Sequence, residues 1–269
     1  MSMIVWQADF YHLSRPSADG ETPWRLTVCD PEGILLHESQ CPRAVAGADW
    51  LTEQLRSIEP PPDIVRVFRP QCAGLFRIAA ERLGWRVEFT RHVRALKRLL
   101  QAREIPIALD RPPPLSIPEN LLGREWRFAR IPAGDLIEFW SDRPLPIRSI
   151  PEEFHPLTLG LASTVPIPGI VIDGGRKSMD LALWIEEQVP VSIEHIPTEA
   201  DRSGGLVLES GLVDRWILAT YEDEEVARAA RLYGERLHDS RGVHFLLIEP
   251  DDSGRTFTGF WLLRQEEKT

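Results

Sequence analysis

The sequence predicts a mixed α/β protein made of two units. Apolar residues recur with the two-residue period of strands and the longer period of helices along the whole chain. A proline run at Pro112–Pro114 separates two such series, and the basic residues concentrate before it. With 269 residues, 43% of them hydrophobic, the chain can bury two cores of ordinary size. We therefore expect domains over 1–111 and 112–269.

The first unit should begin with three strands in a meander. The expected strands cover 4–11, 24–29 and 33–39, with a turn at Asp30–Gly33 between the last two. Helices and strands should then alternate: helix 45–58, strand 64–68, helix 72–83, strand 85–89 and a helix after His92. This order, β-β-β-α-β-α-β-α, is that of ribonuclease H-like domains. It predicts a ribonuclease H-like fold for the first unit and says nothing of its function.

The second unit should begin near Trp126 and form a mixed α/β domain. Six prolines between Pro144 and Pro168 favour an extended, irregular segment and argue against a helix or a central strand there. The elements expected beyond this segment are strands at 169–172, 191–196, 206–209, 215–221, 243–249 and 256–264, and helices at 179–188 and 223–237.

Positive charge is concentrated in the stretch from Ile64 to Arg103. This stretch has ten basic residues and two acids, a local charge of +8 in a chain of net charge −10, so the other residues sum to −18. A concentrated cationic surface is what binding to a phosphate backbone needs, whatever the net charge. The alternative interpretation is a solvated, charged helix face. The basic residues taken as candidates for binding a nucleic-acid backbone are Arg66, Arg69, Arg86, Arg91, Arg94, Lys97 and Arg98.

The helix expected after His92 has two distinct faces. Its apolar stripe consists of Val93, Leu96, Leu99 and Leu100. Arg94, Lys97, Arg98 and Gln101 follow helical spacing on the other side. One helix could therefore pack on a sheet and present its cations outward.

Two aromatic residues lie in the preceding expected strand. Trp85 and Phe89 should share a face of that strand, because side chains alternate along it. They are candidates for stacking on unpaired bases, and the alternative is that they belong to the core.

The loop Asp173–Ser178 lies between an expected strand and an expected helix. Its candidate residues are Gly174, Gly175, Arg176 and Lys177, since glycines allow close backbone approach and cations attract an anion. The spacing matches neither a P-loop nor a dinucleotide-binding fingerprint. Three interpretations remain open: a phosphate contact to a nucleic acid, a structural turn, and a site for a free nucleotide.

Catalytic and metal-binding patterns are absent from the sequence. A ribonuclease H-type nuclease needs about four clustered carboxylates for two metal ions. Asp9 and Glu53 could serve, but Arg69 stands where a further acid would be wanted. The histidines have no ligand spacing, and no hydrolase or zinc motif occurs. We expect neither an enzyme nor a bound cofactor or metal.

The sequence also indicates where the protein should act. It has no apolar leader and no run of eighteen apolar residues, so we expect a cytoplasmic protein without membrane insertion. Its three cysteines form neither a disulfide framework nor a zinc clip. They should be small buried residues.

Several long motifs resemble one family. They are Trp6–Tyr11, Trp24–Asp30, Phe68–Gln71, Pro166–Arg176, Gly211–Trp216 and Asp252–Leu263. Through them the chain resembles the cyanobacterial and chloroplast Tab-two/Atab-two proteins over nearly its whole length. The resemblance implies a non-catalytic RNA-binding factor for translation of photosystem messages, notably those of photosystem I. The implied partners are single-stranded RNA in 5′ untranslated regions and, beyond RNA, translation or photosystem assembly proteins.

Three functions compete on these observations. The first is a non-catalytic RNA-binding translation factor that grips phosphates with the surface of 64–103. The second is a metal- or nucleotide-dependent nuclease-like enzyme using Asp9 or the Asp173 loop. The third is a protein-docking assembly factor for photosystem biogenesis whose basic face is only solvated.

Overall fold

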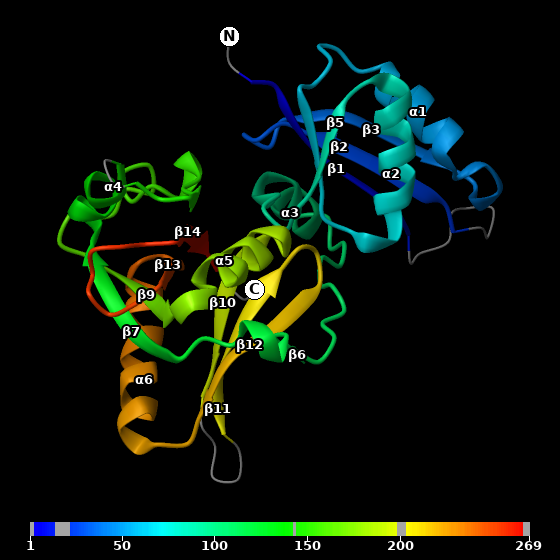
Figure 1. The fold of residues 1–269 in the computed structure, drawn as a ribbon. Coiled ribbons are helices and arrows are strands. Elements are labelled where there is room, and N and C mark those ends of the chain that lie inside the picture. Colours follow the sequence, from blue (N-terminus) through cyan, green and yellow to red (C-terminus); the bar gives the residue numbers. More distant parts are fainter. Residues whose placement is uncertain (1–2, 14–21, 142–143, 198–202, 266–269) are drawn as a thin grey trace. The chain divides into compact units, whose positions relative to one another are not determined.

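A computed structural model describes residues 3–13, 22–141, 144–197 and 203–265, without the side chains of 139–141. The chain is mixed α/β, as predicted, and forms two compact units, Met1–Asp110 and Arg111–Thr269. Figure 1 follows the chain through both units. Each unit is described by itself.

Unit 1 is built on a five-stranded sheet in the order β3-β2-β1-β4-β5. The three N-terminal strands pair antiparallel, whereas β1, β4 and β5 are parallel. Their succession with the helices is the predicted one. The elements are β1 Val5–His12, β2 Trp24–Cys29, β3 Leu35–Cys41, α1 Ala48–Arg56, β4 Ile64–Val67, α2 Pro70–Leu83, β5 Arg86–Phe89 and α3 Arg94–Gln101.

The two faces of this sheet bury different cores. Helices α1 and α2 cover one face, where Trp6, Ala8 and Phe10 of β1 are buried. Helix α3 covers the other face, where Tyr11 packs with Leu96 and Leu100 of the helix. The alternation of side chains along each strand sends neighbouring residues to opposite cores. The three cysteines are free and buried, which confirms the prediction made for them.

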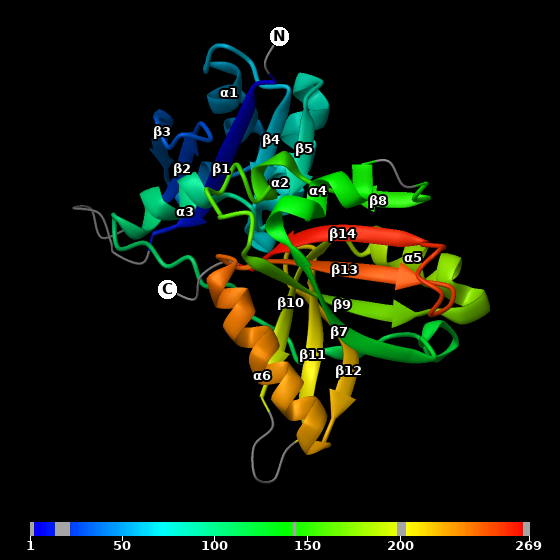
Figure 2. The same cartoon turned by 90° about the vertical axis from the view of Figure 1, so that its left-hand side faces the viewer.

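Unit 2 contains a four-stranded sheet, β10-β11-β12-β6, and a five-stranded sheet, β7-β9-β13-β14-β8. One core lies between the two sheets and takes side chains from α5 and α6; a second core lies on the other face of the five-stranded sheet, with residues of α4. Figure 2 shows α6 running alongside β7 and β9. The elements are β6 Leu115–Ser116, β7 Glu125–Pro132, α4 Ala133–Ser141, β8 Ile147–Ser149, β9 Pro166–Asp173, α5 Ser178–Glu187, β10 Pro190–Ile196, β11 Gly204–Ser210, β12 Asp214–Tyr221, α6 Glu224–Asp239, β13 Val243–Glu249 and β14 Gly259–Arg264.

The proline-rich segment was predicted to contain no central strand, and this is wrong at its end. Strand β9 lies between β7 and β13 and includes Pro166 and Pro168. The strand pairs with β7 along its whole length but with β13 only from Gly169 onward. At the two prolines the strand therefore has a neighbour on one side only, where a missing N–H is tolerated.

Candidate nucleic-acid interface

The face of the unit 1 sheet that α3 covers carries basic residues beyond the helix. Val65, Val67 and Val87 point into the core with α1 and α2. Arg66 on β4 and the two residues Arg86 and Glu88 on β5 therefore point to the opposite face. Glu88 binds both arginines, with its Oε2 3.1 Å from Arg66 Nε and its Oε1 3.1 Å from Arg86 Nη2.

Helix α3 and the residues before it add further cations on this face. Arg98 is exposed and Arg94 partly exposed. Lys97 donates a hydrogen bond from Nζ to the carbonyl oxygen of Arg91 at 2.7 Å and lies 5.5 Å from the centre of the Phe68 ring. We call Arg66, Arg86, Arg91, Arg94, Lys97 and Arg98 the cationic surface of unit 1.

The electrostatics of His92 indicate that four of these six cations lie close together. Burial is the main cause that lowers the pKa of His92 to about 3. The positive charges of Lys97, Arg94, Arg66 and Arg91, in that order, lower this pKa further. Cations of β4, of the segment before α3 and of α3 itself therefore all act on the His92 side chain. His92 stays neutral at physiological pH.

Gln7 of the central strand β1 holds α3 against the sheet through a hydrogen bond. Its side-chain oxygen accepts a hydrogen bond from the backbone amide of Leu96 at 3.0 Å. Leu96 lies in the first turn of α3, where backbone amides have no partner within the helix. Sequence reasoning missed this role, because nothing in the sequence indicates a contact between residues 89 positions apart.

Arg69 adjoins the cationic surface, since it shares the Phe68 ring with Lys97, but its own contacts lie inside unit 1. Its guanidinium lies 2.7 Å from Asp9, whose side chain is fully buried, and it also donates to the carbonyl oxygen of Pro106 at 2.5 Å. It lies over the rings of Phe68 and Tyr11 as well. These contacts engage Arg69 inside unit 1.

The two aromatic candidates point away from the cationic surface. Trp85 and Phe89 pack against the core that contains α1 and α2. The Trp85 ring makes an edge-to-face contact with Trp6, with 5.3 Å between centroids, and the guanidinium of Arg77 lies 5.2 Å from the centre of the Phe89 ring. The two rings share a face, as the alternation predicts, but it is the face opposite Arg66 and Arg86.

The other basic residues of 64–103 are placed elsewhere. Arg77 and Arg82 belong to α2, on the far side of the sheet, and Arg82 pairs with Asp49 of α1 at 2.5 Å. Arg103 pairs with Glu38 of β3. The charge run in the sequence is thus divided between two faces of the unit.

In unit 2, the Asp173 loop is held by its own contacts. The amide of Gly174 donates to the carbonyl oxygen of Glu249, and the amide of Gly175 donates to Asp173 Oδ1, both at 2.8 Å. A Cβ on Gly174 would lie 2.5 Å from the Cα of Ser178. Both glycines are buried, and Gly175 has a φ of +56°. Close packing and backbone conformation account for these two glycines.

The cations of this loop are exposed. Arg176 and Lys177 lie in the 3₁₀ turn Gly175–Lys177 that precedes α5. Lys177 donates from Nζ to the carbonyl oxygen of Asn120 at 2.8 Å. The exposed Arg124 packs against Gly175, where a Cβ would come within 2.5 Å of its Nε. Three cations therefore gather beside this loop, Arg124 among them, which sequence reasoning missed.

Acidic residues do not form a metal site in the part of the chain that the structure describes. No group of three or more His, Cys, Asp or Glu side chains is placed to hold an ion there. Asp9 is buried beside Arg69, and Glu53 lies on the exposed side of α1. Within the same described residues, none of the helices has the length and apolar character needed to cross a bilayer.

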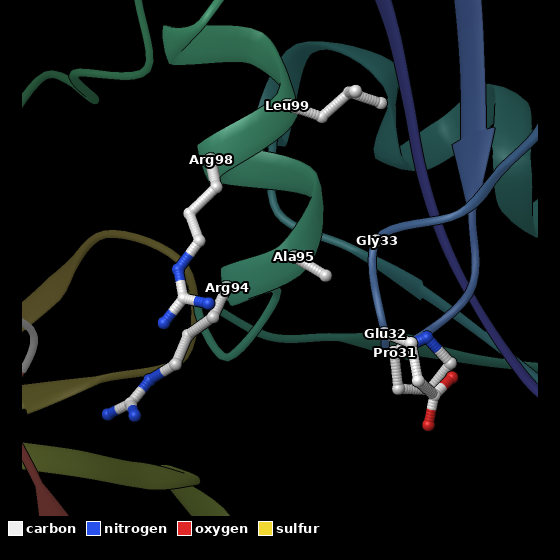
Figure 3. A pocket seen from close by; sticks show the side chains of 7 residues that line it. All are labelled: Pro31, Glu32, Gly33, Arg94, Ala95, Arg98 and Leu99. Carbon is white, nitrogen blue, oxygen red and sulfur yellow. The ribbon is translucent and has the colours of Figure 1, made fainter.

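A shallow pocket adjoins the cationic surface. Arg94 and Arg98 line it together with the turn between β2 and β3, as Figure 3 shows. Sequence reasoning placed a turn at Asp30–Gly33 but assigned it no role in binding. A turn facing a helix far along the chain has no signature in a single sequence.

The chain is similar to known proteins over nearly its whole length. Residues 5–103 match the N-terminal domain model of the RNA-binding protein Tab2/Atab2, and residues 104–264 match the C-terminal domain model. The chain is 29% identical to a chloroplastic TAB2 homologue of Arabidopsis thaliana, over 97% of this chain and 75% of the relative. It is 27% identical to a chloroplastic TAB2 homologue of Zea mays, over 97% of this chain and 72% of the relative. Since the two domain models together cover nearly the whole chain, the protein belongs to the Tab2/Atab2 family of RNA-binding proteins.

Proposed function

We propose that this protein is a non-catalytic, single-stranded RNA-binding factor that grips phosphates with the cationic surface of unit 1. The observation that carries the proposal is the gathering of cations from β4, β5 and α3 on one face of the sheet. Phosphate contacts supply most of the affinity for RNA and need concentrated positive charge. Family membership supports RNA as the ligand.

The proposed phosphate contacts are a subset of the basic candidates. Arg94 and Arg98 are at the centre, because both line a pocket beside α3. Arg66, Arg86, Arg91 and Lys97 extend the surface around them. Arg69, Trp85 and Phe89 instead stabilise unit 1 through their contacts in its interior. In unit 2, Arg176 and Lys177 with Arg124 form a second, weaker phosphate contact, and Gly174 and Gly175 shape the loop.

The proposed role of this binding is in translation of photosystem messages, notably those of photosystem I. The 5′ untranslated region is the proposed RNA element, and translation or photosystem assembly proteins are the proposed further partners. The named relatives are chloroplastic, and for this chain we propose the cytoplasm. The strongly acidic composition of unit 2, with 27 acidic and 17 basic residues in 111–269, supports a separate function for that unit, such as docking a protein.

Charge reversal on α3 tests the proposal. Arg94→Glu combined with Arg98→Glu should weaken binding of a single-stranded RNA at least about tenfold at low salt and flatten the plot of log affinity against log salt by roughly 0.7 per lost contact. The matched control is Arg56→Glu with Arg82→Glu, which changes the net charge equally on the α1 and α2 side.

The control variant should bind RNA much as the native protein does. Both variants should melt close to the native protein, because all four side chains are at least partly exposed. Equal loss in the two variants would show that only net charge matters. An unchanged affinity and salt slope in the α3 variant would refute the assignment and favour a docking role.

A further inference from the structure

A pocket of about 450 Å³ opens between the β2–β3 turn and helix α3. Figure 3 shows the turn on one side of the pocket and the helix on the other. The residues that line it are Pro31, Glu32, Gly33, Arg94, Ala95, Arg98 and Leu99. Pockets that take small ligands have volumes of about 300 to 1,000 Å³, so this one is large enough for a single nucleotide.

Both walls of the pocket are held in place. In the turn, Gly33 donates from its amide to the carbonyl oxygen of Asp30 at 3.1 Å, and Ile34 donates from its amide to Asp30 Oδ1 at 2.7 Å. Gly33 has a φ of +93°, a conformation that suits glycine. Gln7 holds the helix through Leu96, as described above. A site with fixed walls loses little conformational entropy when a ligand binds.

The two sides of the helix present different chemistry to this pocket. In Figure 3, Arg94 and Arg98 project together to one side of α3, whereas Ala95 and Leu99 point toward the turn. The paired guanidinium groups suit a phosphate, which they can bind with several hydrogen bonds. Ala95 and Leu99 with the ring of Pro31 offer apolar surface to the face of a base.

Glu32 is the acidic residue of the lining. A carboxylate accepts hydrogen bonds but cannot donate them. It therefore favours a base whose edge carries accessible N–H donors, as adenine and cytosine do at their amino groups and guanine at its imino and amino groups. Uracil places its one N–H between two carbonyl oxygens, which a carboxylate repels.

We infer that this pocket receives one purine nucleotide of the bound RNA, with its phosphate on Arg94 and Arg98, its base over Ala95 and Leu99, and its donor edge at Glu32. Glu32 is then a residue that determines base preference. The inference rests on the proposed RNA binding by the cationic surface and adds the identity of the base. The larger face of a purine distinguishes it from cytosine, which also has an amino group, because it buries more of the apolar lining.

The test compares two RNAs with the full-length protein by fluorescence anisotropy. One is a twelve-nucleotide oligouridylate, and the other is a matched RNA with adenine at every fourth position. The native protein should bind the adenine-containing RNA roughly fivefold more tightly, as expected for one additional hydrogen bond to a charged group. Glu32→Ala should reduce this preference to less than about twofold, since it removes only the hydrogen-bond acceptor.

Glu81→Ala provides the matched control, because Glu81 is an exposed glutamate of α2 outside the pocket. The Glu81→Ala variant should keep the full preference for the adenine-containing RNA. Glu32 is exposed in a turn, so its replacement should leave the melting temperature unchanged.

The outcomes separate the two proposals. Equal affinity of the native protein for both RNAs, or an undiminished preference in Glu32→Ala, would overturn the purine pocket and leave RNA binding intact. Failure of the native protein to bind either RNA would overturn the proposed function and the pocket together.

Discussion

The carboxylate of Asp9 and the guanidinium of Arg69 lie 2.7 Å apart and join the central strand β1 to the residue that precedes α2. Burial raises the pKa of Asp9 to about 6 even though the charge of Arg69 and the hydrogen bond from it oppose that rise. Desolvation therefore outweighs the ion pair at this carboxylate, which makes Arg69 necessary for keeping it charged inside the unit.

Removal of Arg69 should destabilise unit 1. Arg69→Ala leaves a buried carboxylate without its partner, and breaking such a pair costs about 3 to 5 kcal/mol. Urea unfolding of the variant should show a lower midpoint. Adding Asp9→Asn to Arg69→Ala should recover part of the loss, because the remaining buried group is neutral. A double variant as unstable as the sum of both single changes would contradict the pairing.

His244 should make unit 2 sensitive to acid. Burial lowers the pKa of His244 to about 4, while its Nε2 accepts a hydrogen bond from the amide of Ile193 at 2.8 Å. The unfolded chain takes up a proton near pH 6.5 and the folded one only near pH 4. Stability should therefore fall as pH drops through this window, by about 3 kcal/mol in total.

Chemical denaturation between pH 7 and pH 4 measures this effect. A His244→Gln variant cannot titrate there, so its stability should change less with pH than that of the native protein. Identical pH profiles for the two proteins would exclude His244 as the cause.

Gly169 should not tolerate a side chain. A Cβ there would lie 2.3 Å from the ring of Phe245 on the neighbouring strand β13. Gly169→Ala should cost about 1 to 3 kcal/mol, because the core would have to shift. Gly234 of α6 is the control in the same unit: its Cβ would make an ordinary contact at 3.6 Å, so Gly234→Ala should stabilise the protein by about 0.5 to 1 kcal/mol. Thermal melts of both variants test the contrast.

The Asp173 loop should contribute to RNA binding less than α3 does. Arg176→Ala with Lys177→Ala removes two exposed cations and one exposed hydrogen bond, so the melting temperature should change little. RNA affinity should fall by roughly twofold to fivefold and the salt slope by no more than about 1.4. Unaltered affinity would leave this loop with a structural role only.

RNA incubated with the protein and Mg²⁺ or Mn²⁺ should remain intact. Asp9 is paired with Arg69, and a two-metal nuclease needs several carboxylates around its ions. Gel electrophoresis of labelled RNA measures cleavage directly. Cleavage that Asp9→Asn abolishes would restore the nuclease hypothesis.

The sequence predicted the order of most elements because their hydrophobic periods are strong and local. The helix after His92 shows this: Leu96 and Leu100 are buried, as its apolar stripe requires. The strand β7 and the helix α4 were not predicted. None of the residues of β7 is buried, so the strand is defined by its pairing with β9 more than by a pattern of its own.

The sequence by itself determined that positive charge is concentrated in 64–103, and its motifs identified the family. Only the tertiary structure decided which of these cations share a face. Because side chains alternate between the two faces of a sheet, Arg66 and Arg86 point to the face that α3 covers. Trp85 and Phe89 point to the opposite face. The buried Asp9 pairs with Arg69, which lies 60 positions further along the chain. A buried charge needs its partner close by, and only folding brings residues so distant in sequence together.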